Sequence, residues 1–254
     1  MLIGILGEAG SGKDEAAQHL VHAHGFYSLA LADPIKIMCG WLFDWPEMRL
    51  YGESRFRDAP DARYPFYRCP ACGFTMPGIR EAIDLKASTL ECLCCGGLYP
   101  PEKWKTDLSP RFGLQSLGDW ARNLHQYAYV NLAIERCNCI LDGVDRDPLW
   151  DCLERLGVSE SRWSGDPSVP AERAVISDVR LKDEVRIVQL AEGKVIRIRR
   201  ETRECTTTTG IPKHNSEMEQ RDIPDSDLNG VIENNGTLTE LYRKLEQFVG
   251  VSHA

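Results

Sequence analysis

Apolar and polar positions fall into distinct blocks at the start of the chain. A short apolar run, Leu2 to Leu6, leads into a glycine-rich turn, which predicts a buried strand followed by a tight loop. From Asp14 to His24 the apolar residues recur at helical spacing, and Gly25 follows as a helix stop. The pattern therefore predicts strand, loop and helix in that order.

The same alternation of strands and helices returns later in the chain. Apolar runs predict strands at 29–32, 174–176 and 195–198, and helical patterns cover 33–43 and 182–191. Alternating strands and helices favour an α/β fold with a largely parallel sheet, whose ligands lie at the carboxyl ends of the strands. The loops expected to converge there are 7–14, 32–36 and 177–184.

Two more helices are predicted from their starting residues and apolar faces. Ser109-Pro110 starts one of them, with Phe112, Leu114, Leu117 and Trp120 among its apolar positions. Thr237 and Glu240 form a capping-box pattern at the start of the last, whose apolar face holds Leu241, Leu245, Phe248 and Val249.

Residues 44–109 have a different character, because they are rich in proline, arginine, aromatic residues and cysteine and lack sustained periodicity. This composition predicts an insertion rather than part of the main sheet. We expect one core that spans 1–254, with a small separate module at 66–103 inserted into it.

The glycine-rich turn at 7–14, the phosphate loop, has the spacing G-x-x-x-x-G-K between a predicted strand and a predicted helix. In such a loop the glycines let backbone N–H groups turn toward a triphosphate, and Lys13 neutralises its β- and γ-phosphates. The alternative is a strand-to-helix turn that binds no nucleotide. The residues predicted to bind ATP are Gly7, Glu8, Ala9, Gly10, Ser11, Gly12, Lys13 and Asp14.

Asp14 stands where most loops of this kind have Ser or Thr as a magnesium ligand. A carboxylate can bind Mg²⁺ directly or through water, since Mg²⁺ prefers oxygen ligands. An acidic residue is also favoured at a helix start for electrostatic reasons alone. The sequence is compatible with both roles.

Four cysteines form the pattern C-x₂-C-x₁₉-C-x₂-C, with glycines directly after each pair. Cys69, Cys72, Cys92 and Cys95 would complete a tetrahedral shell around Zn²⁺ and leave no open position, which is typical of a structural site. Cys94 is an alternative ligand of poorer spacing. Redox chemistry or coincidental clustering of cysteines would produce the same pattern.

Composition narrows the class of protein. The chain of 254 residues is 43% hydrophobic with a net charge of −8, which argues against broad binding to nucleic acid. No apolar stretch is long enough to span a bilayer, and the N-terminus lacks the features of a signal peptide. We expect a soluble protein of the cytoplasm, or of the host cytoplasm if a phage encodes it.

Several segments together resemble one family. They are GEAGSGKD at 7–14, LADPIK at 31–36, SPRFGLQSLG at 109–118, ISDVRLKDE at 176–184, HNSE at 214–217 and VIENNGTLTEL at 231–241. Their order is similar to that of the phage-type deoxynucleoside monophosphate kinases. The resemblance implies an adenylate-kinase-like P-loop fold, and an enzyme that moves the γ-phosphate of ATP to a deoxynucleoside monophosphate.

The resemblance also implies roles for polar residues outside the phosphate loop. The acceptor and the transferring group would be contacted by Lys36, Arg111, Gln115, Arg122 and Arg180, with Gln115 near the base. Arginine and lysine suit this chemistry, because phosphoryl transfer depends on positioning and charge neutralisation. Lys13, Arg111, Asp178 and Arg180 are the predicted catalytic set.

Two aspartates have both a functional and a structural interpretation. Asp178 resembles a carboxylate that holds Mg²⁺ through water or orients Arg180, but it could instead cap the following helix. Asp33 would contact the acceptor or simply cap its own helix.

The adenine of ATP is expected to lie near Arg199 and the loop of Asn235, Gly236 and Thr237. A turn followed by a capping box would explain that loop equally well.

Other functions remain open. A kinase of another acceptor, such as a hydroxymethylated base in DNA, would use the same loop, although the acidic charge disfavours DNA. A nucleotide-gated adaptor would make its contact through the zinc ribbon. The ribbon is also a candidate lid, homodimer contact or contact to another protein. The spacing of the motifs does not determine which base the enzyme accepts, whether ordinary or modified.

Overall fold

The structure is a computed structural model of the 254-residue chain. It describes residues 1–8, 10–75, 88–142, 149–156, 171–201 and 215–251. Ala9 of the phosphate loop and residues 76–87 of the cysteine module therefore lie outside the described residues.

The described residues divide into two compact units. The core unit comprises Met1–Met38 and Gly118–Ala254, and the insert unit comprises Cys39–Leu117. The predicted module at 66–103 falls inside the insert unit, which begins and ends well outside it.

The core unit is an α/β structure built on a five-stranded, wholly parallel sheet of order β2-β7-β1-β8-β9. Its strands are β1 (Leu2–Leu6), β2 (Tyr27–Leu29), β7 (Ala174–Val179), β8 (Lys194–Arg199) and β9 (Gly230–Glu233). The central strand is buried along its full length, so it reads as a continuous apolar run. Its register pairs Ile3 with Val175 on one side and Gly4 with Val195 on the other.

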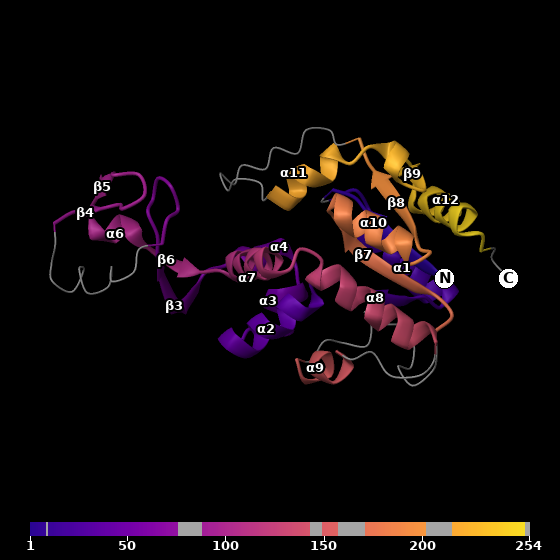
Figure 1. The fold of residues 1–254 in the computed structure, drawn as a ribbon, viewed down its shortest axis with the longest axis horizontal. Coiled ribbons are helices and arrows are strands. Elements are labelled where there is room, and N and C mark those ends of the chain that lie inside the picture. Colours follow the sequence, from indigo (N-terminus) through magenta and orange to yellow (C-terminus); the bar gives the residue numbers. More distant parts are fainter. Residues whose placement is uncertain (9, 76–87, 143–148, 157–170, 202–214, 252–254) are drawn as a thin grey trace. The chain divides into compact units, whose positions relative to one another are not determined.

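Helices cover both faces of this sheet (Figure 1). On one face, α1 (Lys13–His24) and α12 (Leu238–Val249) pack on Ile3 and Ile5. On the other lie α8 (Ala128–Leu141) and α10 (Lys182–Leu190). Gly4 faces α10, where a Cβ atom would meet Val188 at van der Waals distance. The remaining helical segments with bounds in this unit are α9 (Trp150–Arg155), α11 (Asn215–Asp222) and η2 (Asp225–Asp227).

Two helices run from one unit into the other, α2 (Asp33–Phe43) and α7 (Pro110–Leu124). The insert unit itself holds the antiparallel pairs β3 (Asp61–Tyr67) with β6 (Lys105–Leu108) and β4 (Leu90–Glu91) with β5 (Leu98–Tyr99). Its short helices are α3 (Glu47–Tyr51), α4 (Ser54–Asp58) and α6 (Pro101–Trp104).

The alternation of strands and helices predicted the α/β class and the parallel sheet correctly. Three details differ. The second strand ends at Leu29 rather than continuing to Ala32, because residues 31 and 32 turn into α2. Trp120 is exposed rather than part of the buried face of α7. Helix α8 and strand β9 were not predicted.

Within the part of the chain that the structure describes, no helix combines the length and the apolar character that crossing a membrane requires.

Candidate phosphate and metal sites

The phosphate loop joins β1 to α1 at the carboxyl edge of the sheet. Two of its glycines adopt left-handed backbone, Gly10 with φ of 79° and Gly12 with φ of 87°. Only glycine adopts this region without strain, which explains its use here. The N–H of Ser11 donates to the carbonyl of Glu8 (3.1 Å) and closes the turn.

The loop is held by neighbours that leave no room for a side chain at Gly7 or Gly12. A Cβ atom at Gly7 would lie 2.8 Å from the carbonyl oxygen of Ile198 in β8, and one at Gly12 would lie 2.3 Å from Asn234 Nδ2. The buried amide of Asn234, at the end of β9, donates to the carbonyl of Ser11 (2.8 Å). Neighbouring strands therefore fix the loop before any ligand binds.

Ser11 carries an unusual polar atom. Its hydroxyl is buried and has no hydrogen-bond partner among the residues that the structure describes. A buried polar atom without a partner costs free energy, so such atoms are normally paired with protein, ligand or ordered water. A phosphate oxygen at the loop would supply that partner.

Charged residues of the loop pair with one another and with α11. Lys13 Nζ lies 2.8 Å from Asp14 Oδ1, and the side chain of Asp14 is 79% exposed. Arg221 of α11 donates to both carboxylate oxygens of Glu8, each at 2.8 Å. An anionic ligand entering the loop would share or take over the ammonium of Lys13, which carries three N–H donors.

Asp178 connects two of the loops predicted to converge. It lies near the end of β7, and its two carboxylate oxygens accept from the backbone N–H groups of Leu31 (2.7 Å) and Ala32 (3.2 Å). The following helix, α10, is instead capped by Glu184. Asp178 thus holds the β2–α2 turn beside β7, a role that sequence reasoning did not identify.

Asp33 forms a buried ion pair with Arg136 of α8. Arg136 Nη1 donates to Asp33 Oδ2 (3.1 Å), and the two side chains are 1% and 0% exposed. Asp33 also accepts from the N–H of Ala30 (3.1 Å). In this structure its carboxylate has no exposed surface, so the predicted contact with an acceptor would require the ion pair to open.

Glu184 is a buried carboxyl group of the core unit. One oxygen accepts from the N–H groups of Arg180 (2.7 Å) and Leu181 (3.0 Å), which caps α10. Burial raises the pKa of Glu184 to about 7, while these two hydrogen bonds oppose the shift. The nearby charges of Asp178 and Arg122 act on it in opposite directions.

The other predicted acceptor ligands belong to both units. Lys36, Arg122 and Arg180 lie in the core unit, where all three are partly buried. Arg122 Nη2 lies 2.9 Å from Asp119 Oδ1. Arg111 and Gln115 lie in the insert unit, where Arg111 is ion-paired with Asp58.

The predicted adenine loop is fully engaged in local contacts. Thr237 caps α12 and exchanges hydrogen bonds with Glu240, which confirms the capping box. Asn235 Oδ1 accepts from the N–H of Glu201 (2.8 Å), and Arg199 Nη2 contacts both carboxylate oxygens of Asp225. The adenine contact of these residues stays a prediction.

The four predicted cysteines converge in the insert unit. Their sulfur atoms all lie within 4.8 Å of one another, with Cys69 and Cys95 at 3.7 Å and Cys72 and Cys92 at 3.6 Å. Sulfur atoms around a tetrahedral zinc would be about 3.8 Å apart, given Zn–S bonds of about 2.3 Å. Two of the separations therefore match those around a zinc ion, and the cluster as a whole is compatible with one.

Two equivalent turns present these thiols. Gly73 and Gly96 have positive φ, and their N–H groups donate to the carbonyls of Cys69 (2.9 Å) and Cys92 (2.8 Å). Buried Leu90 and Trp104 pack beside the buried cysteines. Cys94, the alternative ligand, is exposed and lies outside the cluster.

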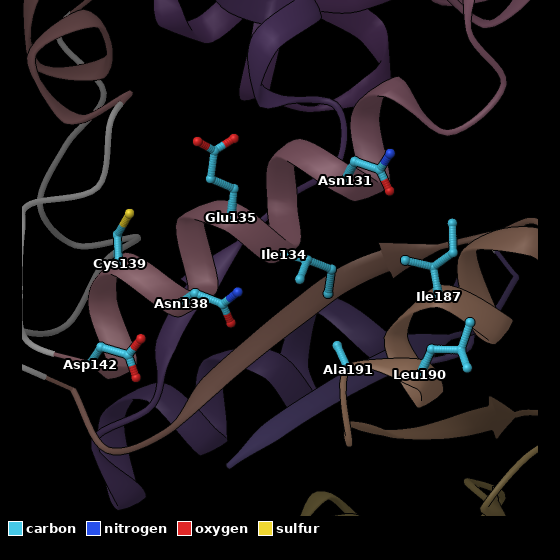
Figure 2. A pocket seen from close by; sticks show the side chains of 9 residues that line it. All are labelled: Asn131, Ile134, Glu135, Asn138, Cys139, Asp142, Ile187, Leu190 and Ala191. Atoms are coloured by element: carbon cyan, nitrogen blue, oxygen red, sulfur yellow. The ribbon is translucent and has the colours of Figure 1, made fainter.

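A separate pocket of about 750 Å³ lies between α8 and α10 (Figure 2). It is lined by Asn131, Ile134, Glu135, Asn138, Cys139, Asp142, Ile187, Leu190 and Ala191. These residues of α10 are at its end, which leads into β8 at the amino edge of the sheet, away from the phosphate loop. None of the predicted site residues lines this pocket.

The sequence patterns did not identify several residues that shape the site. Arg136, Glu184, Arg221 and Asn234 all act through partners that are distant in the chain or through burial. Asn234 and Glu184 both lie in segments that carried the family resemblance, whereas Arg136 and Arg221 do not.

Comparison with known proteins shows similarity to a viral protein. No family model matches the chain. Over 247 residues the chain is 25% identical to a curated protein of Acanthamoeba polyphaga mimivirus, covering 96% of this chain and 94% of that protein. That protein is named "Putative deoxynucleotide monophosphate kinase".

Proposed function

We propose that this protein is an ATP-dependent phosphotransferase that converts a deoxynucleoside monophosphate to the diphosphate. The phosphate loop, preformed at the carboxyl edge of a parallel sheet, is the observation that carries the proposal. The name of the mimivirus protein agrees with this assignment. The order of the sequence motifs supports the narrower assignment to the phage-type kinases.

The loop matches the chemistry of a triphosphate. Left-handed backbone at Gly10 and Gly12 directs N–H groups inward, and the N-terminus of α1 adds partial positive charge. The buried hydroxyl of Ser11, which has no partner among the described residues, can donate to a phosphate oxygen. Lys13, released from Asp14, would neutralise the group that is transferred.

Mg²⁺ supplies charge neutralisation between the β- and γ-phosphates in such reactions. The residues suited to hold it are Asp14, whose carboxylate is exposed at the loop, and Asp178, through water. Asp178 already accepts two backbone N–H groups, which orient its carboxylate. Asp14 is therefore the more available direct ligand.

The acceptor phosphate needs cations at the same edge of the sheet. Arg180 follows β7 directly, and the backbone there is fixed by the cap from Glu184. Arg122 and Lys36 supply further charge in the core unit. Arg111 would have to exchange Asp58 for a phosphate, which a bidentate guanidinium contact makes feasible.

The four thiols of the insert unit would hold Zn²⁺, which would stabilise that unit without taking part in the transfer. A cytoplasmic site of action follows from the proposed substrates. The base, a modified one included, would be chosen by contacts near Gln115 and in the insert unit.

Turnover of ATP with Mg²⁺ against a panel of ribo- and deoxynucleoside monophosphates, modified pyrimidines included, tests the proposal. We expect one or a few deoxynucleotides to be phosphorylated rapidly. Lys13→Ala should lower kcat by about 10² to 10³, because one charged contact to the transferring group is lost. Lys194→Ala serves as a matched control, since this exposed lysine begins β8 at the amino edge of the sheet, opposite the phosphate loop.

ATP binding without turnover on any nucleotide would contradict the proposal and favour a nucleotide-gated adaptor. Turnover only on DNA that contains hydroxymethylated bases would identify another acceptor for the same loop. Equal activity of Lys13→Ala and the wild type would show that the loop does not perform the transfer.

A further inference from the structure

A second cluster of side chains with the chemistry of metal ligands lies in the core unit, between α1 and α12. His19 Nε2 lies 2.8 Å from Glu246 Oε1, and His24 Nε2 lies 3.0 Å from the same oxygen. The three ligand atoms all lie within 4.8 Å of one another. We propose that His19, His24 and Glu246 bind a divalent transition-metal ion, with Zn²⁺ as the best match.

The distances support a site that needs little rearrangement. Zinc bonds to nitrogen and carboxylate oxygen are about 2.0 to 2.2 Å, so neighbouring ligand atoms in a tetrahedron are about 3.3 to 3.5 Å apart. The observed separations of 2.8 and 3.0 Å are shorter by about half an ångström. Small side-chain rotations would open the space for an ion.

The donor set indicates which ion binds. Two imidazole nitrogens and one carboxylate suit Zn²⁺ and its neighbours in the first transition row, whereas Mg²⁺ and Ca²⁺ prefer oxygen alone. Each imidazole would present the lone pair of Nε2 and keep its proton on Nδ1. Water would occupy the fourth position.

The surroundings orient the ligands. The ring of His19 stacks on Tyr242 with centroids 3.8 Å apart and planes at 4°. Tyr242 in turn donates its hydroxyl proton to Glu15. The side chains of His19, His24 and Glu246 are 9%, 6% and 9% exposed, so an ion would be largely shielded from solvent.

The position of the site indicates its effect. Both helices begin beside the phosphate loop: α1 starts at Lys13, and α12 follows the turn that contains Asn234. His24 and Glu246 both lie near the C-terminal ends of these helices. A metal there would join α1 to α12 and stabilise the helix pair that supports the loop, without contacting substrate.

Metal titration of the full-length protein, with the four cysteines already saturated by zinc, tests the site. We expect the wild type to bind one further equivalent of Zn²⁺ or Co²⁺. The cobalt form should absorb in the visible without a thiolate-to-cobalt charge-transfer band, because no sulfur is in the shell. The added zinc should also raise the melting temperature and slow hydrogen exchange in α1 and α12.

Glu246→Gln and His24→Gln should each weaken this second equivalent by more than about tenfold, since each removes a ligand. His22→Gln is the matched control, because His22 lies on the same helix, is exposed and is outside the cluster. Circular dichroism shows whether each variant is folded. The activity without added metal is expected to stay near that of the wild type.

The proposal is overturned if the wild type binds no second equivalent, or if the folded variants bind it as tightly as the wild type. A charge-transfer band from the second cobalt would also overturn it, because that ion would be bound by cysteine. If Glu246→Gln does not fold, His24→Gln decides the question alone. None of these outcomes depends on whether the protein phosphorylates a nucleotide.

Discussion

The phosphate loop and the cysteine ribbon are both glycine-containing turns that present polar groups to a ligand, yet they are stabilised differently. The loop is fixed by β8, β9 and Asn234, next to a large apolar cluster. Among its described residues, the ribbon buries a small cluster around Trp104, beside four thiols that face one another. The loop is thus shaped by the fold of the core unit, whereas we expect the ribbon to depend on a metal ion bound by these thiols.

This difference follows from size. A small module cannot bury enough apolar surface to offset its conformational entropy, so metal binding must supply the missing free energy. The core unit has a wholly parallel sheet covered on both faces, and its packing positions a turn with left-handed glycines and a buried ion pair. Removing each kind of support separately tests the difference.

The largest effect is expected from removing the ribbon metal. Cys92→Ser should unfold the ribbon, because a structural zinc site contributes about 10 kcal/mol of binding free energy. Loss of bound zinc and of structured amide signals from residues 66–103, with signals of the sheet unchanged, would confirm it. Cys94→Ser, at an exposed cysteine outside the cluster, should leave both intact. Unfolding of the whole chain by Cys92→Ser would contradict the separation of the two kinds of support.

The next largest effect concerns the buried ion pair of the core unit. Arg136→Met should lower the free energy of unfolding by about 3 to 5 kcal/mol, because it removes the guanidinium that balances the charge of the buried Asp33 carboxylate. Urea unfolding measures the change. Arg186→Met, at an exposed position on α10, should change it by no more than about 0.5 kcal/mol. Equal values for the two variants would show that the pair does not support the core.

Glu184 should make the core unit sensitive to pH. Burial raises its pKa from the ordinary 4.5 to about 7, so the folded state keeps a proton that the unfolded chain releases between these values. The free energy of unfolding should therefore fall by up to about 3 kcal/mol as pH rises through this window.

Glu184→Gln should remove that pH dependence, because an amide does not titrate in this range. The cap should survive, since the amide oxygen can accept from the same two N–H groups that Glu184 Oε2 now binds. Urea unfolding at pH 5 and at pH 8 gives the change of unfolding free energy with pH for each variant. Glu172→Gln, at a residue outside this cap, is the control and should keep the wild-type slope. An unchanged slope in Glu184→Gln would assign the pH dependence to another group.

The smallest effect separates backbone strain from steric contact in the loop. Gly12→Ala and Gly25→Ala both place a side chain on left-handed backbone, which costs about 1 kcal/mol. Only Gly12 would also press a Cβ atom on Asn234. We expect Gly12→Ala to be about 1 kcal/mol more destabilising and to weaken ATP binding as well. Equal melting temperatures and equal ATP affinities would mean that Asn234 does not fix the loop.

Local features, whose chemistry depends on neighbours in the chain, could be predicted from the amino-acid sequence. The run from Leu2 to Leu6 and the following glycines predicted strand and loop, and the four cysteines that now converge were all chosen by spacing. The capping box at Thr237 was also correct. Each of these signals works because a turn, a helix start or a knuckle is built from residues only a few positions apart.

The roles of the buried polar groups depend instead on how the chain folds in three dimensions. Asp33 pairs with Arg136 across about a hundred residues, and Asp178 holds the backbone of Leu31 and Ala32 rather than a helix end. The convergence of His19, His24 and Glu246 likewise depends on two helices from opposite ends of the chain. Packing of the apolar core brings such partners together. The spacing of residues along the sequence does not indicate which polar groups that packing will bury.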